Sequence, residues 1–284
     1  MATVVSLINM KGGVGKSTLT FNLAWYSAWF GKLRVLAIDL DPQANLSQYF
    51  LGARYYLKLI SKLGTKTIVD IFEQFSAPSA ISGAPTLIEP NDIIAKLEKW
   101  SDGSLLDLVP SRLELAWTLK NPTEKAQLLP QFISKVEENY DLILIDCAPT
   151  ESILTNAAYR SSRYLFVPVK PEFLATIGLP LLARSLNEFR LMHENQQLDM
   201  GGIIFNDKRR SNTPPEQEES CRDVEVTAKK HGWRVFENIA HHSDSFATGS
   251  REGTSIFQTP YARDYVKDEF SGVAKEFLKE IDLK

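Results

Sequence analysis

The chain has 284 residues, of which 44% are hydrophobic and 24% are charged, a composition that suits a protein with a sizeable hydrophobic core. No apolar run approaches the roughly 20 residues that span a bilayer, and the N-terminus lacks the pattern of a secretory signal. The net charge of −3 excludes nucleic-acid binding driven by overall charge, and two cysteines, Cys147 and Cys221, are too few for a disulfide framework or a zinc site.

The first predicted elements are a buried strand, Thr3 to Ile8, a glycine-rich loop, and a helix from Leu19 to Phe30. A strand, a glycine loop and a helix in this order predict a phosphate-binding loop. In such a loop the backbone N–H groups converge on phosphate oxygens, and the N-terminal end of the helix adds a partial positive charge. Lys16 is then expected to reach the β- and γ-phosphates, and Ser17 to ligate Mg²⁺.

A second lysine, Lys11, distinguishes this loop from the common form of the motif, whose first glycine would fall on Met10. The sequence KGGVGKS resembles the deviant Walker A motif of the ParA/MinD family of P-loop ATPases, and within that family the ParA-type partition ATPases. The resemblance implies that ATP is bound by Lys11, Gly12, Gly13, Val14, Gly15, Lys16, Ser17 and Thr18. It also implies that Lys11 reaches the phosphates of a partner subunit in a face-to-face homodimer. A glycine turn with an adjacent lysine and no ligand is the alternative interpretation.

Asp39 and Asp41 lie at the end of the second predicted strand, Lys32 to Leu40. Its near-continuous apolar run is typical of a parallel strand covered on both faces, and ligand-binding residues belong at the carboxyl ends of such strands. The segment DLDPQAN resembles the second signature of the family, which implies that Asp41 orients the attacking water and that Asp39 supports the magnesium shell. A turn in which both acids act only as caps is the alternative.

Residues 48–135 carry weaker signals, and we expect a helical and strand elaboration of the same domain there. Helical spacing predicts helices at Thr67 to Phe75 and at Asn91 to Trp100, and an apolar run predicts a strand at Leu105 to Pro110. No linker-like break or internal repeat is visible, so residues 1–284 are predicted to form a single domain. An N-terminal helix-turn-helix domain, which some plasmid relatives carry, is not expected.

Four consecutive aliphatic residues precede Asp146 and predict another buried strand. This segment resembles the Walker B motif of the family, which implies that Asp146 holds Mg²⁺ directly or through water. A strand that merely ends in an acid is the alternative.

Two later strands, Tyr164 to Val169 and Met200 to Phe205, resemble those that border the nucleotide base in the family. By this resemblance Pro168 and Pro171 contact the nucleotide, and Asn206 hydrogen-bonds the adenine. An Asn that simply ends a strand in a turn is the alternative for Asn206.

A basic loop precedes a polar helix from Glu216 to His231. In relatives that ride on the chromosome, basic residues of the C-terminal third bind DNA phosphates without sequence preference, which implies DNA contacts for Lys208, Arg209, Arg210, Arg251 and Arg263. A solvated charged surface is the alternative, because nearby acids offset much of this charge. The adjacent histidines His241 and His242 have no second cluster at ligand spacing, so a loop is expected there rather than a metal site.

The final segment has apolar residues at helical spacing from Phe270 to Ile281, which is consistent with a membrane-targeting helix of the MinD kind. Acidic residues balance its lysines, however, and this pattern favours a terminal helix that docks on the sheet.

These features predict an α/β fold with one doubly wound, mostly parallel sheet and helices on both faces. By resemblance, the function is Mg²⁺-dependent ATP hydrolysis by an ATP-gated homodimer that partitions DNA or positions cargo. Its expected partners are nonspecific DNA and a ParB-like adaptor that stimulates slow turnover. The expected location is the cytoplasm, on the nucleoid if DNA is bound. A MinD-like membrane-associated regulator is one alternative, and a metabolic reductase, disfavoured by the lack of a cysteine pair to bridge a cluster, is another.

Overall fold

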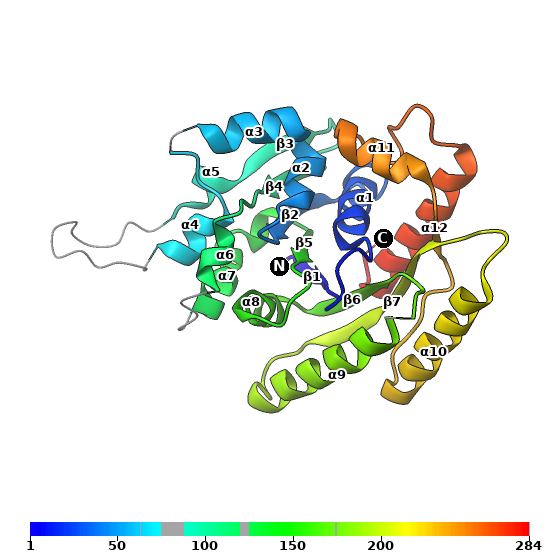
Figure 1. The fold of residues 1–284 in the computed structure, drawn as a ribbon. Helices are drawn as coiled ribbons and strands as arrows, with labels where there is room; N and C mark the ends of the chain where they lie inside the picture. The colour runs from blue at the N-terminus through cyan, green and yellow to red at the C-terminus, as the bar shows by residue number, and fades with distance from the viewer. Residues whose placement is uncertain (63, 75–87, 120–124, 174, 284) are drawn as a thin grey trace.

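The computed structural model describes residues 1–62, 64–74, 88–119, 125–173 and 175–283. Its described strands form one eight-stranded sheet in the order β3-β4-β2-β5-β1-β6-β7-β8 (Figure 1). Neighbouring strands are parallel except at one edge, where β3 runs antiparallel to β4. The strands are β1 (Thr3–Leu7), β2 (Arg34–Leu40), β3 (Ala95–Lys99), β4 (Leu105–Val109), β5 (Leu142–Cys147), β6 (Tyr164–Val169), β7 (Asp199–Lys208) and β8 (Ala240–His241). The predicted mostly parallel sheet is confirmed.

Helices cover both faces of this sheet, and each face has its own hydrophobic core (Figure 1). One core contains α1 (Lys16–Trp29), α2 (Asn45–Leu51) and α12 (Asp264–Glu280). The opposite core contains α4 (Ile68–Glu73), α7 (Leu128–Ser134), α8 (Ile153–Ser161), α9 (Ala175–Met192) and α10 (Pro215–His231). The shorter helices are α3 (Ala53–Ser61), α5 (Pro90–Ile93), α6 (Leu115–Thr118) and α11 (Asp244–Glu252), with 3₁₀ turns at Lys125–Gln127 and Glu137–Asn139.

The central strands are apolar along their length because both of their faces are buried. In β5, Leu142 and Leu144 pack into the core with α1 and α12, whereas Ile143 and Ile145 pack into the opposite core. Successive side chains of a strand point to opposite faces, so a strand between two layers of helices needs apolar residues at every position. The aliphatic run before Asp146 therefore forms a strand as predicted.

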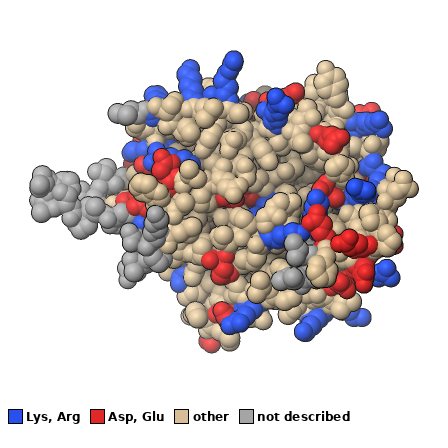
Figure 2. Space-filling view, viewed as in Figure 1, with Lys and Arg blue, Asp and Glu red and all other residues tan. Residues whose placement is uncertain are grey.

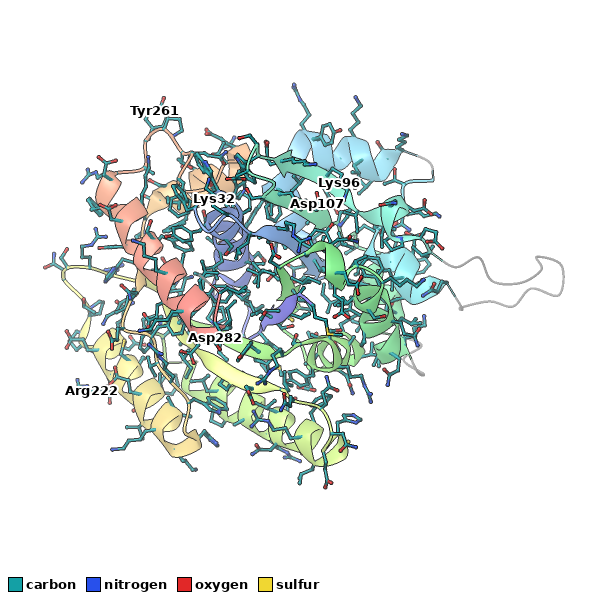
Figure 3. All side chains as sticks on the ribbon, turned by 180° about the vertical axis from the view of Figure 1, so that it is seen from behind. Lys32, Lys96, Asp107, Arg222, Tyr261 and Asp282 are labelled. Carbon is teal, nitrogen blue, oxygen red and sulfur yellow. The ribbon has the colours of Figure 1, made fainter. Side chains whose placement is uncertain are left out.

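One prediction for the sheet edge is wrong. The segment from Asn91 to Trp100 is not a helix: only α5 is helical, and β3 follows it. Ala95 and Leu97 pack against the core while the side chains between and after them face solvent, the alternation of an edge strand. Figure 3 shows Lys96 beside Asp107, and the Lys96 Nζ lies 2.8 Å from the Asp107 Oδ2. This ion pair fixes β3 against β4.

Other predictions for residues 48–135 are confirmed where the structure describes them. The helix predicted from Thr67 is α4, and its first turn has a capping box in which Thr67 and Asp70 exchange hydrogen bonds. The strand predicted from Leu105 is β4. Residues 63, 75–87 and 120–124 of this region lie outside the described residues.

The terminal helix α12 docks on the sheet, as its balanced charge predicts. Its apolar residues Phe270, Val273, Ala274 and Phe277 are all buried in the core with α1. Among the described residues, no helix is long and apolar enough to cross a membrane.

Candidate nucleotide-binding site

The predicted phosphate-binding and acidic residues meet at the carboxyl ends of three adjacent strands. In the sheet, β5 lies between β1 and β2, and Asp146 pairs in register with both Leu7 and Asp39. The glycine loop leaves β1 immediately beyond this point and enters α1 at Lys16. Parallel strands thus bring together residues that are more than a hundred positions apart in the sequence.

Gly15 is the residue of the loop whose backbone most clearly requires glycine. It precedes α1 with φ 84°, in the left-handed region, and a Cβ there would lie 2.1 Å from the Nδ2 of Asn206. The Asn206 Nδ2 donates a hydrogen bond to the carbonyl oxygen of Val14 at 2.9 Å. Asn206 therefore contacts the phosphate loop itself, in addition to any contact with a base.

Lys16 is folded back into the loop. Its Nζ donates to the carbonyl oxygens of Asn9 (3.2 Å) and Lys11 (3.1 Å), and the residue is only 7% exposed. Burial lowers the pKa of Lys16, and the carboxylates of Asp146 and Asp41 oppose that shift. The loop thus holds its lysine between two carbonyl oxygens, near the acids of β2 and β5.

The carboxylate of Asp146 is fully buried, and neither of its oxygens makes a hydrogen bond of normal geometry among the described residues, although the nearby hydroxyl of Ser17 lowers its pKa. Burial, followed by the charge of Asp39, raises the pKa of Asp146 well above its usual value. A buried carboxylate without partners is costly unless a cation or ordered water completes its surroundings. The Asp146 carboxylate and the hydroxyl of Ser17, in the first turn of α1, provide the oxygen ligands that suit Mg²⁺. The residues therefore fit the predicted metal.

A network of serines shapes the segment that carries Asp39 and Asp41. The Asp39 Oδ2 accepts hydrogen bonds from the backbone N–H (2.8 Å) and the hydroxyl (2.6 Å) of Ser47, and its Oδ1 accepts one from the N–H of Asp41. The Ser111 hydroxyl donates to the carbonyl oxygen of Asp41 at 2.8 Å, and the Ser111 N–H donates to the Ser47 hydroxyl. Burial raises the pKa of Asp39 to about 7, although the hydrogen bonds from Ser47 and Asp41 lower it. Asp39 thus organises the turn that presents Asp41.

The sequence alone did not single out Ser47, Ser111 or Asn9 for this site. Asn9 Nδ2 donates to the carbonyl oxygen of Pro168 at 2.8 Å, and its Oδ1 accepts from the N–H of Lys11 at 2.9 Å. It therefore ties the phosphate loop to β6. Of the predicted nucleotide contacts, Pro168 is part of this connection, and Pro168 and Pro171 are both buried.

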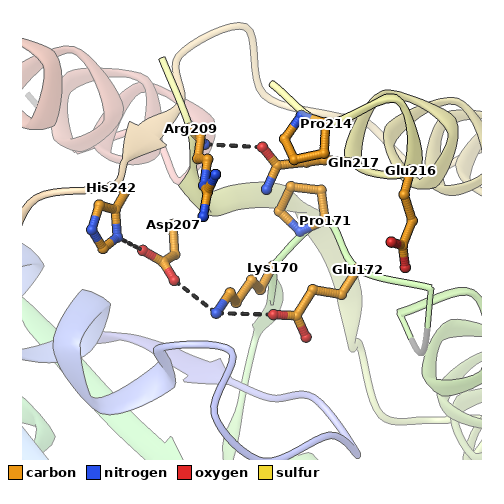
Figure 4. Close-up of a pocket in the computed structure, with 9 residues that line it drawn as sticks. All are labelled: Lys170, Pro171, Glu172, Asp207, Arg209, Pro214, Glu216, Gln217 and His242. Atoms are coloured by element: carbon orange, nitrogen blue, oxygen red, sulfur yellow. Dashed lines mark hydrogen bonds and ion pairs between the residues drawn. The ribbon is translucent and has the colours of Figure 1, made fainter. Parts of the chain in front are cut away.

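Beside the loop, a chain of ion pairs borders a pocket of about 290 Å³ (Figure 4). The Lys11 Nζ lies 2.6 Å from the Glu172 Oε2, and the Lys170 Nζ lies 2.9 Å from the other oxygen of Glu172 and 3.0 Å from Asp207. Asp207 in turn contacts the Nδ1 of His242 at 2.5 Å. Hydrogen bonds from Lys11 and Lys170 lower the pKa of Glu172. The lysine predicted to act on a partner subunit is thus held within its own subunit.

Two of the basic residues predicted to contact DNA, Arg210 and Arg263, lie over the same ring, that of Tyr265. The Arg210 guanidinium pairs with Glu269 and stacks 4.1 Å from the ring of Tyr265. Arg209, Arg251 and Arg263 are exposed, and they lie on different elements. In Figure 2 acidic and basic side chains are intermingled over the side of the molecule formed by α10 and α12.

The two adjacent histidines also have protein partners. His242 contacts Asp207, and the His241 Nδ1 lies 3.1 Å from Glu269. No group of three or more His, Cys, Asp or Glu side chains suited to a metal ion occurs in the described parts of the chain.

The fold and the glycine loop define a P-loop nucleoside-triphosphatase. A family model described as an AAA domain matches residues 2–200. Soj of Bacillus subtilis, a sporulation initiation inhibitor protein, is 32% identical over 211 residues, 72% of each chain. The chromosome partitioning protein ParA of Caulobacter vibrioides is 31% identical over 75% of this chain and 73% of its own. The ATP complex of a Cyanothece McdA variant shares the fold with a TM-score of 0.76 at 20% identity, covering 100% of this chain and 97% of that one. The chain belongs to the ParA/MinD family of P-loop ATPases.

Proposed function

We propose that this protein is a Mg²⁺-dependent ATPase whose ATP-bound dimer partitions DNA or positions an intracellular cargo. The observation that carries this proposal is the buried Lys16 at the start of α1, whose charge acts on the fully buried carboxylate of Asp146 at the end of β5. This arrangement fits a triphosphate with its cation better than it fits a closed structural turn. The proposal includes the prediction that residues 1–284 act as one domain.

Different residues of the site would have different roles in ATP binding and hydrolysis. Backbone N–H groups from Gly12 to Thr18 bind the phosphates, and Lys16 moves from its carbonyl partners to the β- and γ-phosphates. Asp41 orients the attacking water, in the turn that Asp39 organises. Ser17 and Asp146, with Asp39 supporting the shell, would hold Mg²⁺, which would supply positive charge to neutralise the phosphates.

Lys11 supplies the link between ATP and dimerisation in this proposal. It leaves Glu172 and reaches the phosphates of the partner subunit, so that ATP joins two copies and hydrolysis releases them. The dimer binds DNA phosphates without sequence preference, and an adaptor with a basic N-terminal peptide, as a ParB-like protein would have, accelerates slow turnover. The apolar face of α12 is buried in the core with α1, which supports this function over the MinD-like alternative, because a membrane-binding helix needs that face exposed.

One comparison tests the proposal. Binding of an Asp41→Ala protein, in which hydrolysis is slowed, is measured to random duplex DNA and to anionic vesicles, with ADP and with ATP. We expect DNA binding only with ATP, and a steep loss of affinity as salt rises. Vesicle binding without DNA binding would contradict the DNA function and support the membrane alternative.

A further inference from the structure

The helix α3 carries a row of basic side chains on its exposed face. Arg54, Lys58 and Lys62 recur every four residues, the last at the residue that ends the helix, so they lie along one side of it. All three are exposed, and none has an ion-pair partner among the described residues. Figure 2 shows Lys and Arg side chains gathered at the top edge of the molecule, where Figure 1 places α3.

No acid neighbours this row in the sequence. Residues 42–69 contain no Asp or Glu, although the whole chain has more acids than bases. Like charges four residues apart destabilise a helix by about 0.2–0.5 kcal/mol per pair. A helix that keeps such a row despite this destabilisation is suited to binding an external polyanion.

Arg251 extends the basic surface from a second element. It lies in the last turn of α11, and Gly253 is the residue that follows this helix. A Cβ on Gly253 would lie 3.5 Å from the backbone nitrogen of Gly52, the residue before α3. Arg251 is two residues before Gly253, and Arg54 is two residues after Gly52. Both arginines are therefore close in sequence to the point where the two glycines meet.

The same helix is connected to the nucleotide site. Its one buried residue, Tyr56, donates from its hydroxyl to the carbonyl oxygen of Ser111 at 3.2 Å. Ser111 in turn hydrogen-bonds the backbone of Asp41. Two hydrogen bonds therefore connect the turn of Asp41 to α3.

We propose that α3 and Arg251 form the surface through which this protein binds duplex DNA, an inference that rests on the proposed function. Successive cations on α3 are about 6 Å apart along the helix axis, and phosphates of one DNA strand recur about every 3.4 Å of duplex axis. Several phosphates therefore lie within reach of the row. This surface differs from the loop of Lys208 to Arg210, where Arg210 is already neutralised by Glu269.

The arrangement of apolar residues on α3 favours DNA over a lipid surface. Tyr55 and Leu57 are 60% and 61% exposed, but they flank the basic row on opposite sides, about 160° apart around the helix. A helix that lies in a membrane needs one continuous apolar face. On α3 that face contains Tyr56 and is packed against the protein.

The test compares a triple variant, Arg54→Ala, Lys58→Ala and Lys62→Ala, with a matched variant that removes three exposed charges from α10, Arg222→Ala, Lys229→Ala and Lys230→Ala. Both are made in the Asp41→Ala protein, and binding to a random duplex with ATP is followed by fluorescence anisotropy over a range of salt concentrations. We expect the α3 variant to bind at least tenfold more weakly. The slope of log K against log salt should fall by about 2–3. The α10 variant should bind as the parent does. Replacing Lys58 and Lys62 by Arg instead should preserve binding.

The outcomes separate the two proposals. If the parent protein binds no DNA with ATP, the proposed function fails. If the parent binds and the α3 variant binds equally well, or if the α10 variant loses binding instead, the assignment of the surface is wrong. If the α3 changes abolish binding to phosphatidylserine vesicles but leave DNA binding intact, the surface binds lipid. Thermal unfolding of each variant shows whether the fold is retained.

Discussion

Lys11 and Glu172 form an ion pair across the mouth of the phosphate loop, with 2.6 Å between the Nζ and the Oε2. The other oxygen of Glu172 is held by Lys170, which also contacts Asp207. Glu172 therefore keeps a cationic partner when Lys11 departs. An ATP-dependent dimer that uses Lys11 in trans must first break this contact.

Replacing Glu172 by Gln is expected to lower the ATP concentration at which the dimer forms. The charge that holds Lys11 within its own subunit is lost, while the length and shape of the side chain are kept. Because the pair is partly exposed, its contribution is below about 1 kcal/mol. We therefore expect a two- to fivefold lower ATP concentration at half-dimerisation, measured by light scattering in the Asp41→Ala background.

Two variants control this experiment. Glu216→Gln changes an acid of the same pocket that has no ion pair with the phosphate loop among the described contacts, and it should leave the dimerisation threshold unchanged. Lys11→Ala should retain nucleotide binding but lose both dimerisation and ATPase activity. Unchanged turnover in Lys11→Ala would remove this lysine from the mechanism.

The sequence predicted the parts of the site that are contiguous in the chain. The loop from Lys11 to Thr18, and the acids at the ends of β2 and β5, follow from local patterns of glycine, charge and buried strands. The site also depends on pairings that such patterns do not contain. Asn9 with Pro168, and Lys11 with Glu172, are separated by 159 and 161 residues. They exist because β1 and β6 are neighbours in the sheet.

In the fold, too, some elements follow from local sequence patterns and others do not. Strands buried on both faces are continuous apolar runs and were predicted correctly. The edge strand β3 is short and half exposed, and its Lys and Glu residues give few apolar positions from which to tell a strand period from a helical one. The basic row of α3 was not predicted, because the family resemblance implies DNA contacts in the C-terminal third of the chain.

Gly15→Ala is expected to destabilise the protein and weaken ATP binding by at least tenfold. The added Cβ would occupy a left-handed backbone position, at a cost of about 1–2 kcal/mol, and would collide with the Asn206 amide. Gly12→Ala is the matched control for stability, because its Cβ would meet only the Pro149 side chain, at 4.0 Å. Thermal unfolding and nucleotide titration measure both effects. If Gly15→Ala unfolds at the same temperature as Gly12→Ala, the described loop conformation is wrong.

Tyr56→Phe tests the connection between the nucleotide site and α3. The change removes one hydroxyl, and with it the hydrogen bond to Ser111, at a cost of about 1 kcal/mol. We expect the ratio of DNA affinities with ATP and with ADP to fall two- to fivefold. Tyr55→Phe removes the same atom from an exposed ring of the same helix and should not change this ratio. Equal ratios in all three proteins would show that the nucleotide does not act on α3 through Tyr56.

Glu276→Gln tests the anchor that holds α12 on the sheet. The Glu276 carboxylate is 8% exposed, and it accepts hydrogen bonds from the N–H groups of Glu237 and Asn238, from the Asn238 amide and from Arg234. Replacement by Gln should lower the free energy of unfolding by about 2–3 kcal/mol at neutral pH, because bonds to a charged acceptor are lost. Glu280→Gln removes the other acidic partner of Arg234 from a more exposed position and should cost less than about 1 kcal/mol.

The pH dependence of the stability lost in Glu276→Gln shows whether the carboxylate charge is its cause. Burial raises the pKa of Glu276, but the hydrogen bonds from Asn238, Glu237 and Arg234 outweigh burial and leave the pKa below its usual value of 4.5. A carboxyl whose pKa is lower in the folded state stabilises the fold fully above its unfolded pKa, and the stabilisation disappears as the pH falls through the folded pKa. Denaturant unfolding should therefore show a gap between wild type and Glu276→Gln that is constant above about pH 5 and narrows below about pH 4.5. A gap that does not change with pH would mean that packing, and not the carboxylate charge, anchors α12.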